Sequence, residues 1–216
     1  MTIGFMDRQQ TRKQREFIRR EQEILDAALI LFAQKDWQAV TVEQIAKQAE
    51  IGKGTVYKHF SCKEEIYGAI ALAHFNKFDE QWGDTPDGAS IMDAIEHVLL
   101  QAFKITLEDP VGTKVTHYCK RAEIQRRLPK TIVETFDGIE KEHRCFFEEL
   151  LVEGMKNGEI PEQSIDELVI ALHTAYHGTL AMIWDGEILH YPELTPERFI
   201  QINSQFMLAG ILGKRK

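Results

Sequence analysis

The sequence predicts an all-α protein in which a three-helix N-terminal domain precedes a larger C-terminal helical bundle. Apolar residues recur at helical spacing along almost the whole chain, and no segment shows the alternation of a half-buried strand. Prolines and glycines divide this pattern into lengths typical of helices, with breaks at Asp109-Pro110, Leu128-Pro129, Asn157-Gly158 and from Gly186 to Pro196. We therefore expect helices packed on helices, without a sheet.

The N-terminal third contains three expected helices. The first lies within residues 16–35, and its apolar face is formed by Ile24, Ala27, Ala28, Leu31 and Phe32. Thr41 precedes a short helix over 42–49, and Gln44, three residues later, completes a capping box. Another short helix is expected over 53–60.

The rest of the chain contains longer predicted helices. Ser61 with Glu64 offers a cap for a helix that runs to about Trp82, and the composition GDTPDGAS then indicates a loop. Further helices are expected at about 90–108, 114–127, 130–157, 164–185 and 196–212. We place the domain boundary so that residues 1–66 form the first domain and residues 67–216 the second.

Composition places the chain among ordinary soluble proteins. Hydrophobic residues make up 44% of its 216 residues and charged residues 28%, which excludes a mostly disordered chain. The longest uncharged run, 17 residues from Leu168 to Trp184, is too short and too polar to predict a membrane span. The first residues lack the apolar region of a signal peptide, and the three cysteines form no CxxC pair. We expect a cytoplasmic protein with free thiols and no contact with a membrane.

Charge is distributed unevenly along the chain. Residues 1–63 have a net charge of +3, whereas residues 64–216 have a net charge of −11. Within the basic third, residues 8–20 contain six basic residues and one acidic residue. The part from Arg12 to Arg20 is either a solvated extension of the first helix or an arm of the kind that contacts the minor groove of a nucleic acid. The acidic charge of the larger part argues against a nucleic-acid-binding surface there.

The segment from Thr41 to Phe60 has the pattern of a helix-turn-helix. Two short helices are separated by a three-residue turn that contains a glycine, and the second helix of such a motif enters the major groove. Gly54 leaves room for DNA to approach the backbone closely, and the Tyr57 hydroxyl can donate to a phosphate. The polar residues at one end of the second helix are Lys53, Thr55, Lys58 and His59. The expected inward-facing residues are Ile51, Val56 and Phe60.

From Ile24 to Ile66 the sequence resembles the TetR family of bacterial one-component regulators. The matching residues are Ile45-Ala46, Ala49, Ile51, the run Gly52-Lys53-Gly54-Thr55-Val56-Tyr57-Lys58-His59-Phe60, and Lys63-Glu64-Glu65-Ile66. Two positions depart from the family pattern. Glu50 stands where the family usually has glycine, so a residue with a side chain must make the tight turn. Gly52 stands where a capping serine or threonine is usual, which removes one phosphate contact.

The resemblance implies roles for individual residues. Thr41 caps the first motif helix and touches a phosphate, while Lys53, Thr55 and Lys58 lie near base edges or flanking phosphates. Tyr57 and His59 contact phosphates, and Lys63 holds the DNA backbone with its amino group and nearby amides. For two of these residues an alternative stays open. Tyr57 could be a partly packed aromatic residue with a hydrated hydroxyl, and His59 could cap the end of its own helix.

The resemblance also implies that the last two helices, 164–185 and 196–212, form a homodimer. On the first of them a stripe of mostly small residues allows close approach, namely Ala171, Ala175, Gly178 and Met182. On the second, the partner surface is Phe199, Ile202, Phe206, Met207 and Gly210. The alternative is that these residues pack inside the protomer's own core.

The family further implies an effector cavity inside the C-terminal bundle. Its candidate lining combines aromatic and histidine residues, which would suit a mostly apolar ligand with one or two polar groups. These residues are Phe103, His117, Tyr118, Phe147, His173, Tyr176, His177 and Trp184. The alternative for each of them is plain core packing.

Two other classes of function are disfavoured by the sequence. An enzyme with a metal centre would use the Glu-x-x-His patterns at Glu140–His143 and Glu187–His190, or the pair His173 and His177. One of the two patterns falls in a predicted loop, and the histidine pair lacks the Glu of a His-Glu-x-x-His motif, so we expect no metal, cofactor or catalytic site. A helix-turn-helix that binds only protein is disfavoured by the lysines around Tyr57. The sequence therefore predicts a homodimeric repressor that binds a near-palindromic double-stranded DNA operator and is released by a small, largely apolar effector.

Overall fold

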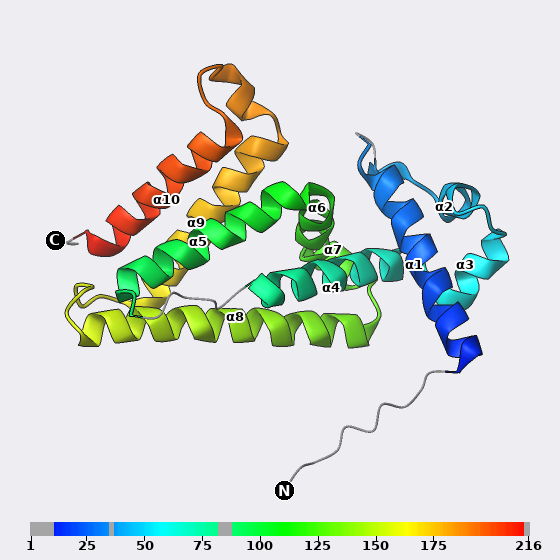
Figure 1. Cartoon of the computed structure of the whole chain (residues 1–216), viewed down its shortest axis with the longest axis horizontal. Helices are drawn as coiled ribbons and strands as arrows, with labels where there is room; N and C mark the ends of the chain where they lie inside the picture. The colour runs from blue at the N-terminus through cyan, green and yellow to red at the C-terminus, as the bar shows by residue number, and fades with distance from the viewer. Residues whose placement is uncertain (1–10, 35–36, 82–87, 214–216) are drawn as a thin grey trace, which may run out of the picture. The chain divides into compact units, whose positions relative to one another are not determined.

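A computed structural model describes residues 11–34, 37–81 and 88–213. These residues form ten α-helices, two short 3₁₀ helices and no strand (Figure 1). The helices are α1 (Arg12–Phe32), α2 (Val42–Gln48), α3 (Lys53–His59), α4 (Lys63–Gln81), α5 (Ile91–Glu108), α6 (Pro110–Cys119), α7 (Ala122–Gln125), α8 (Lys130–Lys156), α9 (Ile165–Trp184) and α10 (Pro196–Leu212). The 3₁₀ helices are η1 (Trp37–Ala39) and η2 (Glu187–His190). The prediction of an all-α fold is confirmed, while Arg8, Lys35, Trp82 and most of the predicted GDTPDGAS loop lie outside the described residues.

Two predicted caps have different outcomes. The Thr41 hydroxyl accepts a hydrogen bond from the Gln44 amide at 3.2 Å, and the Gln44 side chain accepts one from the Thr41 amide at 2.8 Å, as the capping box requires. At Ser61 the predicted partner is wrong. The amide and hydroxyl of Ser61 both donate to Glu65, while Glu64 is buried and pairs with Arg127.

The predicted single helix over 114–127 is also wrong. α6 begins at Pro110, since a proline at the first helical position lacks only an N–H that would have no partner inside the helix. It ends at Cys119, and the short α7 follows. Residues 120 and 121 separate the two helices without a proline or glycine, so no local sequence signal indicated this break.

The chain folds into two compact units whose limits differ from the predicted domain boundary. Unit 1 comprises the chain up to His74 together with Val111–Val133, and unit 2 comprises Phe75–Pro110 and Glu134–Lys216. Unit 1 therefore contains α6 and α7 as well as the helix-turn-helix. It has a net charge of +6, whereas unit 2 has a net charge of −14.

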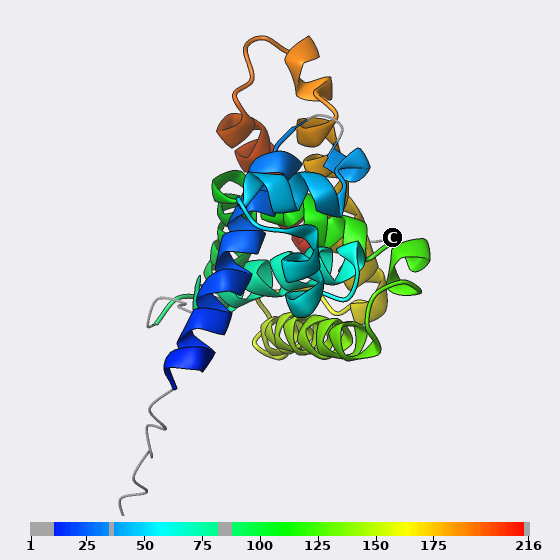
Figure 2. The ribbon, with the colours of Figure 1, turned by 90° about the vertical axis from the view of Figure 1, so that its right-hand side faces the viewer.

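An aromatic cluster explains why α6 belongs to unit 1. The cluster consists of Phe32, Trp37, Tyr67 and Tyr118, which come from α1, η1, α4 and α6. The ring of Tyr118 lies 5.0 Å from the ring of Trp37 and 5.7 Å from the ring of Tyr67, both edge-on. Tyr67 in turn lies 5.2 Å from Phe32, so rings far apart in sequence pack as one group. Within the same unit, α1, α2 and α3 lie together in both views (Figures 1 and 2).

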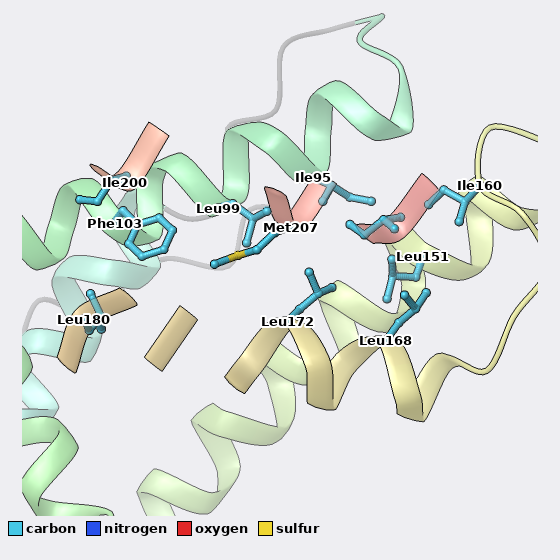
Figure 3. Packing of buried hydrophobic residues seen from close by; sticks show 11 residues of the cluster. Ile95, Leu99, Phe103, Leu151, Ile160, Leu168, Leu172, Leu180, Ile200 and Met207 are labelled. Atoms are coloured by element: carbon cyan, nitrogen blue, oxygen red, sulfur yellow. The ribbon is translucent and has the colours of Figure 1, made fainter. Parts of the chain in front are cut away.

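Unit 2 is built around an aliphatic core. Its labelled side chains point toward one another from α5, α8, α9, α10 and the α8–α9 connection (Figure 3). The cluster contains Ile95, Leu99, Phe103, Leu151, Ile160, Leu168, Leu172, Leu180, Ile200, Met207 and Ile211. Removing such side chains from water is the main stabilising contribution, about 1.5–3 kcal/mol for each. Among the helices described, none is long and apolar enough to cross a membrane.

Candidate nucleic-acid interface

The turn between α2 and α3 depends on a residue with left-handed backbone. Glu50 has φ = 54°, the single positive φ among described residues other than glycine. This conformation lets the Ile51 amide donate to the Ala46 carbonyl at 3.0 Å, which closes the end of α2. The sequence prediction that a residue with a side chain makes this turn is confirmed. The conformation carries a strain of about 1–2 kcal/mol.

The buried side of α3 fixes its orientation in unit 1. Val56 is fully buried and Phe60 nearly so, as the sequence predicted, and Ile51 is partly buried. Ile45 of α2 is also fully buried. Because these side chains hold α3 against α2, which itself packs on α1, the opposite side of α3 is presented to solvent on a fixed support.

The outer face of α3 consists of Lys53, Gly54, Tyr57 and Lys58, all of them exposed. Their spacing of one, four and five residues places them on the same side of the helix. Tyr57 is 48% exposed, and the Lys53 ammonium lies 3.9 Å from the Glu43 carboxylate at the surface. Thr55 is half-buried at the edge of this face. The arrangement offers two cations and a phenol hydroxyl to an anionic partner.

The glycines at the start of α3 are not required by internal packing. A Cβ added to Gly52 or Gly54 would meet nothing within 4 Å. Gly54 lies in the first turn of α3. Glycine within a helix lowers the free energy of unfolding by about 0.5–1 kcal/mol relative to alanine. Gly52 is the N-cap of α3 and provides no side-chain hydrogen bond, as its departure from the family pattern implied. The open space at Gly54 fits close approach by a molecule outside the chain.

His59 is placed differently from the other predicted phosphate contacts. Its side chain is only 7% exposed and packs on α1, where its ring lies 4.1 Å from the ring of Phe17. Its Nδ1 lies 3.8 Å from Glu21 Oε1 and makes no hydrogen bond. The burial of His59 does not favour the expected phosphate contact, so we leave it out of the proposed DNA face.

The Lys63 side chain is also engaged in contacts within the protein. Its ammonium donates to the carbonyls of Gln38 at 2.8 Å and Val40 at 2.9 Å, and it lies 5.3 Å from the centre of the Tyr67 ring. Burial lowers the pKa of this amino group. Lys63 therefore ties the segment before α2 to the start of α4, and its amino group is not presented to DNA as expected. Thr41 is exposed, with its hydroxyl engaged in the capping box.

Part of the basic arm is neutralised within α1. Arg19 pairs with Glu16 at 2.5 Å and with Glu23 at 2.7 Å, and Arg20 pairs with Glu23 at 2.7 Å. These pairs fit a solvated helix extension for this part of the arm. The remaining described basic residues of the arm are Arg12, Lys13 and Arg15, and all three are exposed.

The predicted effector-lining residues do not form one group. His117 and Tyr118 lie in unit 1, and the other six lie in unit 2. Tyr118 belongs to the aromatic cluster, and Phe103 is fully buried in the core of unit 2 against Tyr176, with ring centres 4.8 Å apart. The hydroxyl of Tyr176 is already bonded within unit 2, lying 3.2 Å from Thr106 Oγ1 and 3.4 Å from the Ala102 carbonyl, and burial raises its pKa.

Several unit 2 residues from the predicted cavity are less buried. His173 is exposed and its ring lies tilted against that of His177, with ring centres 4.3 Å apart, while His177, Phe147 and Trp184 are half-buried. In the described part of the chain no three His, Cys, Asp or Glu side chains are placed to hold a metal ion. Glu187 and His190 lie on η2 at the surface, 3.8 Å apart.

The predicted dimer surface is partly core. Ala175 packs against the core of unit 2 and Met207 is buried within it. The exposed residues of the two expected stripes are Ala171, Gly178, Ile202, Phe206 and Gly210. Phe206 is 73% exposed, and Ile170, which the sequence prediction missed, is 63% exposed. Both helices therefore present apolar side chains to solvent in addition to those they bury.

Comparison with known proteins agrees with this geometry. The sequence model of the family described as "Bacterial regulatory proteins, tetR family" matches residues 24–70. The chain is 27% identical over 95 residues to the HTH-type transcriptional repressor KstR of Rhodococcus jostii, covering 44% of each chain. It is 28% identical over 141 residues to the fatty acid metabolism regulator protein of Bacillus subtilis, covering 65% of this chain and 70% of the relative.

Solved structures share the fold. The transcriptional regulator FadR from Bacillus subtilis, in complex with stearoyl-CoA, superposes with a TM-score of 0.67 at 20% identity. This superposition covers 88% of this chain and 98% of FadR. The family match falls on the same helices that present the outer face of α3. Residues 24–70 therefore form the N-terminal domain of the TetR family of bacterial regulatory proteins, and the chain as a whole shares the fold of TetR-like regulators.

Proposed function

We propose that the chain is a DNA-binding transcriptional repressor that reads a near-palindromic operator with the outer face of α3. The observation that carries the proposal is the combination of Gly54, Tyr57 and Lys58 on one exposed side of a helix whose other side is fixed by Val56 and Phe60. Gly54 makes α3 less stable without serving any internal packing, which is expected where DNA must approach the backbone. Thr41, Lys53 and Thr55 complete the proposed DNA-binding set.

The proposed assembly is a homodimer formed by α9 and α10. The exposed side chains of Ile170 and Phe206, with the small residues Ala171, Gly178 and Gly210, support a close helix packing between two copies. A two-fold dimer offers two copies of α3 to a palindrome whose half-sites lie about 34–36 Å apart. No catalytic residue is part of this proposal, and the relatives described above are named as regulators.

The proposed effector is a fatty acyl compound, with an acyl-CoA as its first candidate. Two comparisons support this class: the sequence match to the fatty acid metabolism regulator of Bacillus subtilis, and the match to the structure of FadR from the same organism with stearoyl-CoA. We place the acyl chain among the aliphatic side chains that the helices of unit 2 bring together, near the half-buried Trp184. Effector and DNA would favour different conformations of the dimer, and binding of one would then weaken binding of the other.

DNA binding is tested with a duplex that the wild-type protein selects from a randomised library. Tyr57→Phe combined with Lys58→Ala removes one hydroxyl and one charge from the outer face of α3, without altering its buried side. We expect weaker binding to all sequences and a slope of log affinity against log salt that is about 0.9 shallower, because one lysine no longer neutralises a phosphate. Lys141→Ala on α8, which removes an exposed charge from unit 2, is the matched control and should bind like the wild type. Equal affinity of the double variant and the control would contradict the proposed face.

Effector binding is tested by thermal unfolding and by DNA release. Stearoyl-CoA should raise the melting temperature, because a ligand of the folded state stabilises by RT ln(1 + [L]/Kd), and it should displace the selected duplex. Free CoA, which lacks the acyl chain, is the control that shows how much of the thermal shift depends on the apolar acyl chain. Trp184→Ala should reduce the thermal shift and leave DNA binding of the ligand-free protein intact. No shift with any of a series of acyl-CoA chain lengths would contradict this effector class.

A further inference from the structure

The segment between α6 and α8 is strongly basic in an otherwise acidic part of the chain. Residues 111–133 contain six basic residues and one acidic residue, a net charge of +5, although residues 64–216 as a whole carry −11. Four of the six are exposed: Arg121, Arg126, Arg127 and Lys130. We call these four residues the basic patch. They lie within ten consecutive positions, around the short helix α7.

The basic patch belongs to unit 1, which also contains the helix-turn-helix. Arg127 pairs with the buried carboxylate of Glu64, the second residue of α4. The side chains of Leu128 and Ile132 lie so close to Gly68 of α4 that a Cβ at Gly68 would come within 2.7 Å of Ile132 Cδ1. Tyr118, just before the patch, packs on Trp37 of η1. The patch is therefore anchored against the start of α4 and the segment before α2.

Two charges of the basic patch have contacts within unit 1: Arg127 pairs with Glu64, and Arg121 lies 5.3 Å from the centre of the Tyr118 ring. Lys130 is the first residue of α8, and the first turn of α8 contains no acidic residue. A cation at the positive end of a helix macrodipole is unfavourable by a few tenths of a kcal/mol. Like charges at Arg126, Arg127 and Lys130 also repel one another. Four exposed cations within ten positions give this part of unit 1 a positive potential that attracts anions.

We propose that the basic patch binds backbone phosphates of the DNA that flanks the segment read by α3, which rests on the proposed function. Lys63, the residue expected to hold the backbone near the start of α4, has its amino group bonded to two main-chain carbonyls instead. The patch lies beside the same end of α4 and supplies exposed guanidinium and ammonium groups, which suit phosphate oxygens. DNA is favoured over a phosphate-bearing effector because the patch shares a compact unit with α3, whereas the acyl-chain site is proposed in unit 2.

The test replaces three residues of the patch and keeps the ion pair of Arg127 with Glu64. Arg121→Gln, Arg126→Gln and Lys130→Gln are combined, and binding is measured by fluorescence anisotropy across a range of salt. The probes are the library-selected duplex with flanks of about one helical turn and the same duplex trimmed of its flanks. On the flanked duplex the slope of log affinity against log salt should become shallower by about 0.9 for each phosphate that the variant no longer neutralises. On the trimmed duplex the variant and the wild type should differ little.

A charge-matched control separates direct phosphate binding from overall charge. Lys141, Lys156 and Arg198 are exposed basic residues of unit 2, and replacing all three by glutamine removes the same charge. This control should keep the wild-type slope on both duplexes, and melting curves check that both variants are folded. An unchanged slope in the patch variant on the flanked duplex would overturn the inference. If that unchanged slope came with weaker binding of CoA or pyrophosphate, the patch would be assigned to a small anionic ligand instead of DNA. Failure of the wild type itself to bind any duplex would contradict the proposed function instead.

Discussion

The two compact units differ in net charge and in the way their side chains are used. Unit 1 has a net charge of +6, and several of its polar groups are fixed by capping boxes, by Lys63 on main-chain carbonyls and by the pair of Arg127 with Glu64. Unit 2 has a net charge of −14 and an aliphatic core, with further apolar side chains exposed on α9 and α10. A polyanion is attracted to the first unit and repelled by the second. The contrast fits the proposed function, in which unit 1 binds DNA and unit 2 provides the dimer interface and the effector site.

The largest effect is expected from breaking the proposed interface of unit 2. Phe206→Glu places a charge on an exposed apolar position of α10, where an apolar interface between two copies would have to bury it without a partner. We expect monomers by sedimentation, with an affinity for the selected duplex reduced at least tenfold. Leu100→Glu, an exposed apolar position on α5, is the matched control and should stay dimeric. A dimer of Phe206→Glu with normal affinity would move the interface elsewhere.

A smaller effect is expected from a substitution in unit 1 that should raise stability and lower DNA affinity at the same time. Gly54→Ala fills open space in α3 and should raise the free energy of unfolding by about 0.5–1 kcal/mol. The same methyl group should lower the affinity for the selected duplex about tenfold, because it keeps the backbone from approaching the DNA. Chemical denaturation and anisotropy measure the two quantities on one sample. A stabilised variant with full affinity would show that DNA does not approach the backbone at Gly54.

The smallest effect concerns the turn before α3. Glu50→Gly should relieve the strain of a left-handed residue, although glycine also makes the unfolded chain more flexible. The net gain is expected to be about 0.5 kcal/mol, seen as a rise of the melting temperature by a few degrees at most. Glu43→Gly, inside α2, should instead lower it. Reduced stability of Glu50→Gly would mean that the Glu50 side chain makes an interaction worth more than the strain.

Structural features that depend only on neighbouring residues could be predicted from the sequence. Helix periodicity, the capping box of Thr41 and Gln44, the turn at Glu50 and the buried side of α3 were all predicted, because each is decided within one or two helical turns. The family motif itself lies in this local segment. Local pattern therefore predicted most of the outer face of α3.

Features that depend on distant parts of the chain were not predictable. His59 and Lys63 match the family motif, but Phe17 packs on one and two main-chain carbonyls bind the other, and neither partner can be read from the motif. Counting charge over residues 64–216 concealed the basic segment 111–133, because only the packing of Tyr118 and Leu128 shows that it belongs with the helix-turn-helix. The same packing places His117 and Tyr118 in a different unit from the other expected effector residues.

Amide hydrogen exchange with and without the selected duplex tests most directly whether unit 1, rather than unit 2, binds the DNA. Exchange reports the local opening of each helix, so it compares both units in a single measurement. The account predicts slower exchange on DNA binding in α2, in α3 and at the start of α4, with no slowing in the exposed turns of α9 and α10. Protection concentrated in unit 2, with α3 unchanged, would contradict it.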